Sequence, residues 1–275
     1  GTVKLAEEGI EEFSLDAWYL LEYVTGVSKA MYFAEPERAV SEENADRYID
    51  CIRRRAAHIP LQHITGEQEF MGYPFCVNEH VLIPRQDTEI LVEEAIQVMR
   101  PKMKVLDMCT GSGCIVLSIL KMCREKYYMT DLQGIGADVS EEALKVAREN
   151  GRRLGVPVTW LQSDLFAKIP EEEKYDVIVY NPPYIEKDVI DTLQEEVRLH
   201  DPYIALDGKE DGLYFYRRII SEADKYLKPQ GKLMFEIGCD QAEAVEELMK
   251  NAGYEQITVK KDLAGLDRVV YGTLQ

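Results

Sequence analysis

From residue 104 onward the chain alternates short apolar runs with longer stretches of helical periodicity. The apolar runs cover residues 105–108, 134–138, 158–162, 177–180, 232–237, 256–259 and 268–271. Helical patterns lie between them, at residues 113–125, 141–154, 213–227 and 241–252. Such alternation predicts an α/β fold with a mostly parallel, seven-stranded, doubly wound sheet. Because ligands bind beyond the carboxyl ends of strands in these sheets, the residues that follow each strand are the candidate functional residues.

Residues 1–66 have a different pattern, and a chain of 275 residues has room for two domains. Helical spacing recurs at residues 15–23, 28–34 and 41–58, which predicts a small helical domain. The aromatic residues expected in its core are Trp18, Tyr19, Tyr23, Tyr32 and Tyr48. Residues 67–83 are expected to form a β-hairpin linker, and residues 84–275 the α/β domain.

The first strand of the alternating region runs into a loop of small residues, with Asp107, Thr110, Gly111 and Gly113 in sequence. Small residues let the backbone approach a ligand, and the following helix offers the N–H groups of its N-terminus. A dinucleotide-binding fingerprint needs a third glycine where this chain has Val116, which argues against a nicotinamide enzyme.

Acidic residues also end the next two strands. Asp138 follows the second strand, where a carboxylate can accept hydrogen bonds from the two hydroxyls of a ribose. Asp164 and Leu165 follow the third strand, and an acid beside an apolar side chain suits an adenine ring with its exocyclic amine. Three successive strand ends therefore offer sites for an amino-acid tail, a ribose and an adenine.

The fourth strand ends in Asn181, Pro182, Pro183 and Tyr184. Two consecutive prolines fix the backbone and remove two donors, which leaves the Asn181 side-chain oxygen and the Pro182 carbonyl as acceptors. A planar NH2 group has two donors to match them, and Tyr184 offers a flat surface for stacking. Acceptors placed around such a nitrogen favour localisation of its lone pair, which makes it a better nucleophile.

The three strand ends together resemble the S-adenosylmethionine site of class I methyltransferases, which have a Rossmann-like fold. The tetrapeptide at 181–184 resembles the signature of methyltransferases that act on planar NH2 groups, either of nucleic-acid bases or of glutamine side chains. Further segments are similar to the peptide-chain release factor glutamine methyltransferase family. These segments are residues 60–67, 69–70, 81–85, 88–89, 211–213, 216–218, 236–238, 261–265 and 267–268.

The resemblance implies an enzyme that transfers a methyl group from S-adenosylmethionine to the side-chain amide of the glutamine in the Gly-Gly-Gln loop of release factors. The residues implied in cofactor binding are Asp107, Thr110, Gly111 and Gly113 at the methionine end, Asp138 at the ribose, Asp164 and Leu165 at the adenine, and Asn181. The residues implied in substrate binding are Asn181, Pro182, Pro183 and Tyr184, and those in catalysis are Asn181, Pro182 and Tyr184. Cys109 replaces the family's usual glycine, and Gln86 replaces a usual proline.

The balance of charge separates the remaining alternatives. The chain has 32 Lys and Arg residues against 50 Asp and Glu residues, a formal net charge of −18. Binding to nucleic acid draws its affinity from Lys and Arg that neutralise phosphates, so an amino-methylating nucleic-acid enzyme is the weaker alternative. A third alternative is a cofactor-binding module that binds release factors without catalysis. The excess acid favours a locally basic protein partner.

Other features set further expectations. The N-terminal residues lack the apolar core of a signal peptide, and the six cysteines include no Cys-x-x-Cys pair, so we expect free thiols and a cytoplasmic protein. The four histidines do not have the spacing of metal ligands, and no metal is expected. No apolar run is long enough to cross a bilayer, and we expect a monomer that neither enters a membrane nor binds DNA directly.

Overall fold

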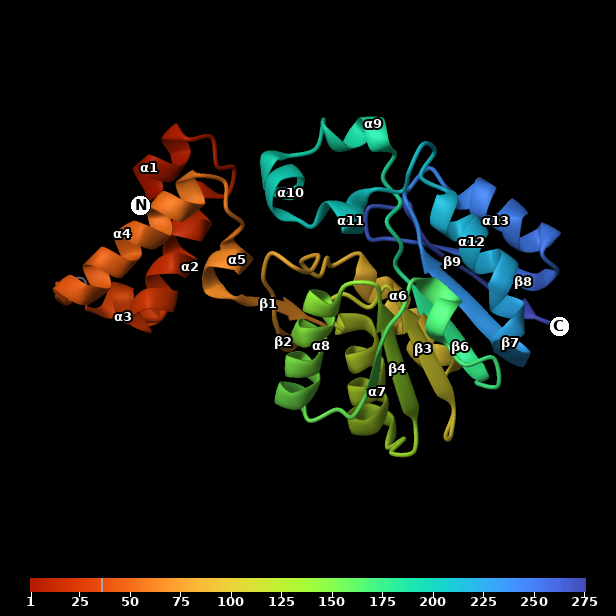
Figure 1. Ribbon diagram of the computed structural model, residues 1–275. Coiled ribbons are helices and arrows are strands. Elements are labelled where there is room, and N and C mark those ends of the chain that lie inside the picture. Colours follow the sequence, from red (N-terminus) through yellow and green to blue (C-terminus); the bar gives the residue numbers. More distant parts are fainter. Residues whose placement is uncertain (36) are drawn as a thin grey trace. The chain divides into compact units, whose positions relative to one another are not determined.

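The computed structural model describes residues 1–35 and 37–275 (Figure 1). This part of the chain divides into two compact units. The first contains Gly1–Glu67 and Gln194–His200, and the second contains Gln68–Leu193 and Asp201–Gln275. The segment Gln194–His200 packs with helices that precede it by more than a hundred positions, although sequence reasoning places it within the region 84–275.

The described residues of the first unit form helices and connecting loops, apart from Glu67, where β1 begins. Its helices are α1 (Thr2–Glu7), α2 (Phe13–Thr25), α3 (Lys29–Ala34), α4 (Glu42–Ala56), α5 (Leu61–Thr65) and α10 (Glu195–His200). The Ser28 and Ser41 side chains cap α3 and α4, because each accepts a hydrogen bond from a backbone N–H in the first turn. The guanidinium of Arg55 is buried and pairs with Asp16 at 2.6 Å and with Glu196 of α10.

The expected aromatic core of this unit is wrong at three positions. Tyr19, Tyr23 and Tyr32 expose 46%, 47% and 44% of their surface. Helix α2 buries the stripe of Ala17, Leu20 and Val24, whose three- and four-residue spacing places them on one side. Tyr19 and Tyr23 fall on the neighbouring stripe, so the same periodicity that predicts the helix also leaves them in solvent.

The hairpin consists of β1 (Glu67–Phe70) and β2 (Tyr73–Cys76). Gly72 has a φ of +77° in the turn between them, a conformation that glycine adopts without steric cost. Phe70 and Phe75 are buried and pack edge to face, with ring centroids 6.0 Å apart. Both rings belong to the core beneath α6 and α7, so the hairpin is anchored to the second unit.

The second unit contains the expected seven-stranded sheet, and the predicted fold class is confirmed. Its strands are β3 (Lys104–Met108), β4 (Gln133–Asp138), β5 (Thr159–Gln162), β6 (Tyr175–Tyr180), β7 (Leu227–Glu236), β8 (Tyr254–Lys261) and β9 (Asp267–Leu274). They are ordered β5-β4-β3-β6-β7-β9-β8. The first five are parallel, whereas β9 is antiparallel to both of its neighbours.

Helices cover both faces of this sheet (Figure 1). The helices α6 (Thr88–Val98), α7 (Cys114–Tyr127) and α8 (Glu141–Leu154) lie on one face, and α12 (Tyr214–Glu222) and α13 (Ala242–Asn251) lie on the other. Successive side chains of each strand point to opposite faces of the sheet and so contribute to both helical layers. Val105 packs in the core with α6 and α7, whereas Leu106 and Met108 pack in the core with α12 and α13.

The expected helix over residues 213–227 is wrong at its C-terminal end. Helix α12 stops at Glu222 and continues as a 3-10 turn over Ala223–Lys225. Leu227 is instead the first residue of β7, where it pairs with Tyr175 and is buried. The Leu227 side chain would suit the end of an amphipathic helix, but here it packs in the core of the sheet domain.

Two short helices follow the tetrapeptide, namely α9 (Lys187–Ile190) and α11 (Tyr203–Leu206). Neither has enough residues to show a helical period in the sequence. All six cysteines are free thiols. Among the described residues, no helix is long and apolar enough to cross a membrane.

Candidate active site

The order of the strands defines where the site lies. The chain passes outward from β3 to β4 and β5, then returns to place β6 on the other side of β3. The loops after β3 and β6 therefore leave the sheet in opposite directions, which opens a crevice at their carboxyl ends. The loop with Cys109–Gly113 and the loop with Asn181 begin on the two sides of this crevice, since Met108 pairs with Tyr180.

The loop after β3 is held in an unusual backbone conformation. Cys109, Gly111 and Gly113 have φ values of +54°, +53° and +79°. A Cβ atom on Gly113 would lie 2.8 Å from the Trp160 side chain, so this position needs glycine for space as well as for conformation. Cys109 adopts the left-handed conformation without being glycine, which costs about 1 kcal/mol. The loop curves back on itself here, with the Gly113 N–H donating to the Thr110 carbonyl at 2.8 Å.

Asp107 does not line the crevice, contrary to the expectation that it contacts a ligand directly. Its carboxylate is fully buried beneath the loop, where Oδ2 accepts from the Thr110 hydroxyl at 2.6 Å and from the Val116 N–H at 3.3 Å. The alternation of β3 turns this side chain toward α7 and away from the cavity. Burial raises the pKa of Asp107 to about 7. Its position is that of a brace between the strand, the loop and the first turn of α7.

Asp138 lies at the edge of the crevice and joins two loops. Its Oδ2 accepts from the Gly111 N–H and its Oδ1 from the Ser140 N–H, both at 2.9 Å. Burial raises the pKa of Asp138, while these backbone donors oppose the shift. Each oxygen retains a free lone pair, so the carboxylate can accept two further hydrogen bonds from a ligand.

Asp164 and Leu165 bound the crevice at the end of β5. Leu165 is buried, whereas the Asp164 carboxylate is largely exposed and pairs with Arg218 of α12 at 3.1 Å. The Arg218 guanidinium also lies over the Tyr214 ring, 5.7 Å from its centroid. An exposed acid with one flexible partner remains available to a ligand, because surface ion pairs contribute little free energy.

The tetrapeptide after β6 is rigidly supported. Asn181 is half-buried, and its Nδ2 donates to the Thr88 hydroxyl at 3.4 Å. Pro182 and Pro183 are buried, and the Tyr184 carbonyl accepts from the Gln241 amide at 3.0 Å. The segment with Gly208 packs so closely on Tyr184 that a Cβ atom on that glycine would lie 2.7 Å from the Tyr184 backbone.

Tyr184 occupies a different position from the one expected. Its ring packs against the core on the α12 and α13 side, and its hydroxyl donates to Glu236 Oε1 at 3.3 Å. Burial and the nearby Glu236 carboxylate raise the pKa of Tyr184. The ring is therefore turned away from the cavity and holds the tetrapeptide to β7.

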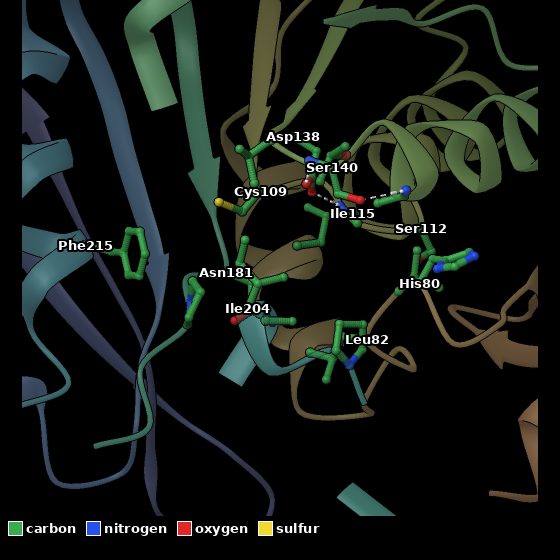
Figure 2. A pocket seen from close by; sticks show the side chains of 18 of the residues that line it. His80, Leu82, Cys109, Ser112, Ile115, Asp138, Ser140, Asn181, Ile204 and Phe215 are labelled. Carbon is green, nitrogen blue, oxygen red and sulfur yellow. Dashed lines mark hydrogen bonds between the residues drawn. The ribbon is translucent and has the colours of Figure 1, made fainter. Parts of the chain in front are cut away.

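One cavity of about 320 Å³ collects most of the candidate residues, a volume typical of small-molecule sites. The candidates that line it are Thr110, Gly111, Asp138, Asp164, Leu165, Asn181 and Pro183. Asp107, Gly113, Pro182 and Tyr184 lie outside the lining and support it from behind. Figure 2 shows Asp138, Ser140, Cys109 and Asn181 around this space, together with Phe215 and Ile204 from the second half of the chain.

Several supporting residues escape sequence reasoning. Thr88 and Arg218 fall in segments that carry the family resemblance, but no local pattern assigns them a role. Gln241 reads only as the start of a helix, yet its side-chain amide bonds Gly238, Tyr216, Tyr184 and Gly212. Only the folded chain brings the Tyr216 hydroxyl and the three backbone groups within reach of one side chain.

Within residues 1–35 and 37–275, no three or more His, Cys, Asp or Glu side chains are grouped to hold a metal ion. The polar groups that line the cavity instead include two carboxylates, one carboxamide, the hydroxyls of several serine and threonine residues, and the cationic side chains of Arg85, Lys209 and Arg218. This donor set suits an organic ligand with hydroxyl and amine groups.

The fold and the cavity define a class of protein. A family model described as "Methyltransferase domain" matches residues 99–270, which is more than half of the chain, so the chain belongs to the methyltransferases. The fold agrees with a solved structure, that of the Thermus thermophilus 16S rRNA N2 G1207 methyltransferase in complex with AdoMet and guanosine. The two have a TM-score of 0.54 and 14% identity, over 76% of this chain and 50% of that one.

Similarity over the full length narrows the class. A model described as "PrmC N-terminal domain" matches residues 1–66. The release factor glutamine methyltransferase of Clostridium acetobutylicum is 41% identical, over 97% of this chain and 93% of that protein. The protein of the same name from Caulobacter vibrioides is 39% identical, over 98% of this chain and 92% of that protein. The chain belongs to the release factor glutamine methyltransferase family.

Proposed function

We propose that this protein transfers the methyl group of S-adenosylmethionine to the side-chain amide nitrogen of the glutamine in the Gly-Gly-Gln loop of peptide-chain release factors. The observation that carries the proposal is the position of Asn181. It is the first residue of a proline-stiffened tetrapeptide and faces the same cavity as Asp138. An acceptor suited to an amide NH2 and an acceptor suited to a ribose thus line one space.

The residues of the cavity fit the cofactor. Asp138 would accept from the ribose hydroxyls, and Asp164 with Leu165 would take the adenine. The loop of Thr110 and Gly111 would meet the methionine end with its backbone. Asp107 and Gly113 would shape this loop without touching the ligand. When bound, S-adenosylmethionine supplies a methyl group that is activated by its positive sulfonium.

The substrate amide would be held by the tetrapeptide. The Asn181 Oδ1 and the Pro182 carbonyl would accept the two hydrogens of the glutamine NH2, which favours the lone pair on its nitrogen. Pro183 would pack on the amide, and Tyr184 would keep the tetrapeptide in place through Glu236. Alignment of the nitrogen with the methyl carbon supplies a further part of the rate.

Direct transfer requires no covalent bond to the enzyme. The Cys109 thiol lines the cavity, but burial and neighbouring carboxylates raise its pKa far above the ordinary value, so it stays protonated at neutral pH. The proton that the amide releases after transfer passes to solvent or to a bound water. We further propose that the protein works as a monomer in the cytoplasm, where it serves translation termination.

A mass-resolved methylation assay tests the proposal. The protein, S-adenosylmethionine and a release factor are incubated together. The mass of the peptide that contains the loop is then measured by mass spectrometry after digestion. We expect one added methyl group when the loop carries glutamine and none when it carries alanine. Methylation of duplex or single-stranded DNA instead would favour the nucleic-acid alternative. Cofactor binding by calorimetry without methylation of any release factor would favour the non-catalytic module.

A further inference from the structure

A polar cluster adjoins Asn181, in which Thr88 lines the same cavity and Glu236 lies buried outside its lining. Glu236 is the last residue of β7 and exposes 2% of its surface, and Thr88 is the first residue of α6 and exposes 3%. The Tyr184 hydroxyl donates to Glu236 Oε1 at 3.3 Å. Among the described residues, Glu236 Oε2 has no hydrogen-bond partner. A nearly unexposed carboxylate beside a catalytic loop calls for a functional explanation.

The hydrogen bonds of this cluster have a direction. The Thr88 hydroxyl lies beside the Glu236 carboxyl and lowers its pKa as a donor would, and the Thr88 oxygen accepts from the Asn181 Nδ2 at 3.4 Å. A hydroxyl has one hydrogen, so a Thr88 that donates to Glu236 can only accept from Asn181. This arrangement requires the Asn181 carboxamide to present its NH2 group to Thr88 and leaves its oxygen on the opposite side.

The direction matters because the two ends of a carboxamide have opposite roles. An oxygen turned toward the substrate accepts a hydrogen from the glutamine NH2, whereas an NH2 in that place would meet another NH2. Without Glu236 as an acceptor, the Thr88 hydroxyl is free to donate to the Asn181 oxygen. The flipped carboxamide would then be stabilised, and the site would lose its acceptor.

We propose that Thr88 and Glu236 are positioning residues, which together orient the Asn181 carboxamide so that its oxygen faces the substrate amide. The inference rests on the proposed function, because it assigns the orientation a role in methyl transfer. Glu236 lies outside the lining of the cavity, and Thr88 lines it beside Asn181. Both act through Asn181.

Protonation of Glu236 would change the same set of contacts from Glu236 through Thr88 to Asn181. Burial raises the pKa of Glu236 to about 7, and the nearby Asp87 also raises it, whereas Arg268 and the hydroxyls of Thr88 and Tyr184 oppose the shift. A protonated Glu236 has an O–H that can donate to Thr88, which leaves the Thr88 hydroxyl free to donate to Asn181. Turnover is therefore expected to fall as the pH decreases through about 7.

The experiment uses the full-length protein with Thr88→Val, Thr88→Ser and Asn181→Ala, alone and in combination. Valine keeps the shape of threonine and removes only the hydroxyl, and serine keeps the hydroxyl. We expect Thr88→Val to lower kcat by about tenfold to a hundredfold, the scale of a misplaced catalytic group, with the Kd for S-adenosylhomocysteine unchanged. Thr88→Ser should retain most of the rate.

A double-mutant cycle distinguishes positioning from a merely structural role. If Thr88 acts through Asn181, then adding Thr88→Val to Asn181→Ala should lower kcat by less than twofold further. Independent, multiplicative losses would overturn the inference. So would a Thr88→Val protein that turns over at the wild-type rate.

Glu236→Gln supplies a second, independent test. Glutamine keeps the volume and does not titrate, but its NH2 can donate to Thr88. The Thr88 hydroxyl is then free to donate to the Asn181 oxygen. We expect a lower kcat and the loss of the step near pH 7, and an unchanged rate with an unchanged pH profile would contradict the inference. If the wild-type protein itself fails to methylate a release factor, the proposed function fails instead, so the two failures are distinguishable.

Discussion

Replacement of Asn181 by alanine tests the central acceptor of the site. The substitution removes the carboxamide that the tetrapeptide holds at the cavity and leaves the backbone of both prolines intact. Because the oxygen is proposed to act on the substrate nitrogen, its loss should appear in the rate of methyl transfer. It should scarcely affect folding or cofactor binding.

The structure sets the scale of the two effects. The only hydrogen bond recorded for the Asn181 side chain within the described part of the chain is the 3.4 Å contact to Thr88, which is long and only partly buried. Its loss should cost less than about 1 kcal/mol of unfolding free energy, or roughly 2–4 °C in Tm. Removal of one preorganised polar group from an active site costs about 10²- to 10³-fold in kcat, or roughly 3–4 kcal/mol. The catalytic effect should therefore exceed the effect on stability several times over.

The assay compares three proteins on one release factor. Wild type, Asn181→Ala and Asn251→Ala are assayed for initial rates of methylation, for Tm, and for the Kd of S-adenosylhomocysteine. Asn251 is exposed at the end of α13, outside the cavity, and provides the matched control. Only Asn181→Ala should lose methylation, and all three should bind the cofactor product with similar affinity.

Two results would refute this reasoning. Undiminished methylation by Asn181→Ala would mean that its oxygen is not the acceptor. A large fall in Tm, together with weak product binding, would mean that Asn181 supports the fold and not the chemistry.

Three further predictions concern the cofactor side of the cavity. Asp138→Ala leaves the Gly111 and Ser140 N–H groups without their acceptor. Calorimetry should then show a Kd for S-adenosylhomocysteine that is raised by about tenfold to a hundredfold, or roughly 1.4–3 kcal/mol. An unchanged Kd would contradict the assignment of Asp138 to the ribose. Cys109 has a φ of +54°, which a β-branched residue adopts only with strain. Cys109→Val should therefore lower the free energy of urea unfolding by at least about 1–2 kcal/mol, whereas Cys109→Gly should not lower it. Equal effects of the two substitutions would be inconsistent with strain at this position. The pKa of Asp107 is about 7 in the folded protein against an ordinary value of 3.8, so the folded state binds the extra proton between these pH values and stability falls as the pH rises. Asp107→Asn should remove a slope of up to roughly 1.4 kcal/mol per pH unit between pH 5 and 7 from denaturant unfolding, and a slope identical to that of wild type would show that the carboxylate is already ionised at pH 5.

Local patterns carry most of the architecture. The apolar runs after residue 104 and the helical stretches between them predict the strands of the sheet, because hydrophobic periodicity reports directly which side of each element is buried. Gly72 predicts the turn of the hairpin, and Ser41 predicts the start of α4, because turns and caps depend on single residues. The misjudged end of α12 lies where one apolar residue, Leu227, fits either a helix or a strand.

Some features of the candidate site are likewise predictable from the sequence, and others are not. Sequence alone locates the strand ends and identifies the proline-stiffened tetrapeptide, because both are contiguous in the chain. It does not tell which of two acids that end neighbouring strands faces the ligand. Asp138 lines the cavity and Asp107 lies beneath the loop, a difference set by the alternation of the strand and the path of the backbone.

The supports of the site are decided by tertiary structure alone. Thr88, Glu236 and Asn181 come from three elements separated by many residues, and they meet because α6 packs on the sheet where β6 and β7 end. No local pattern encodes a hydrogen bond between such distant side chains, since its geometry depends on how the layers pack. The sequence by itself therefore determined the class of fold and the chemistry that this protein presents. Only the packed structure decided which polar groups face the cavity and which hold the others in place.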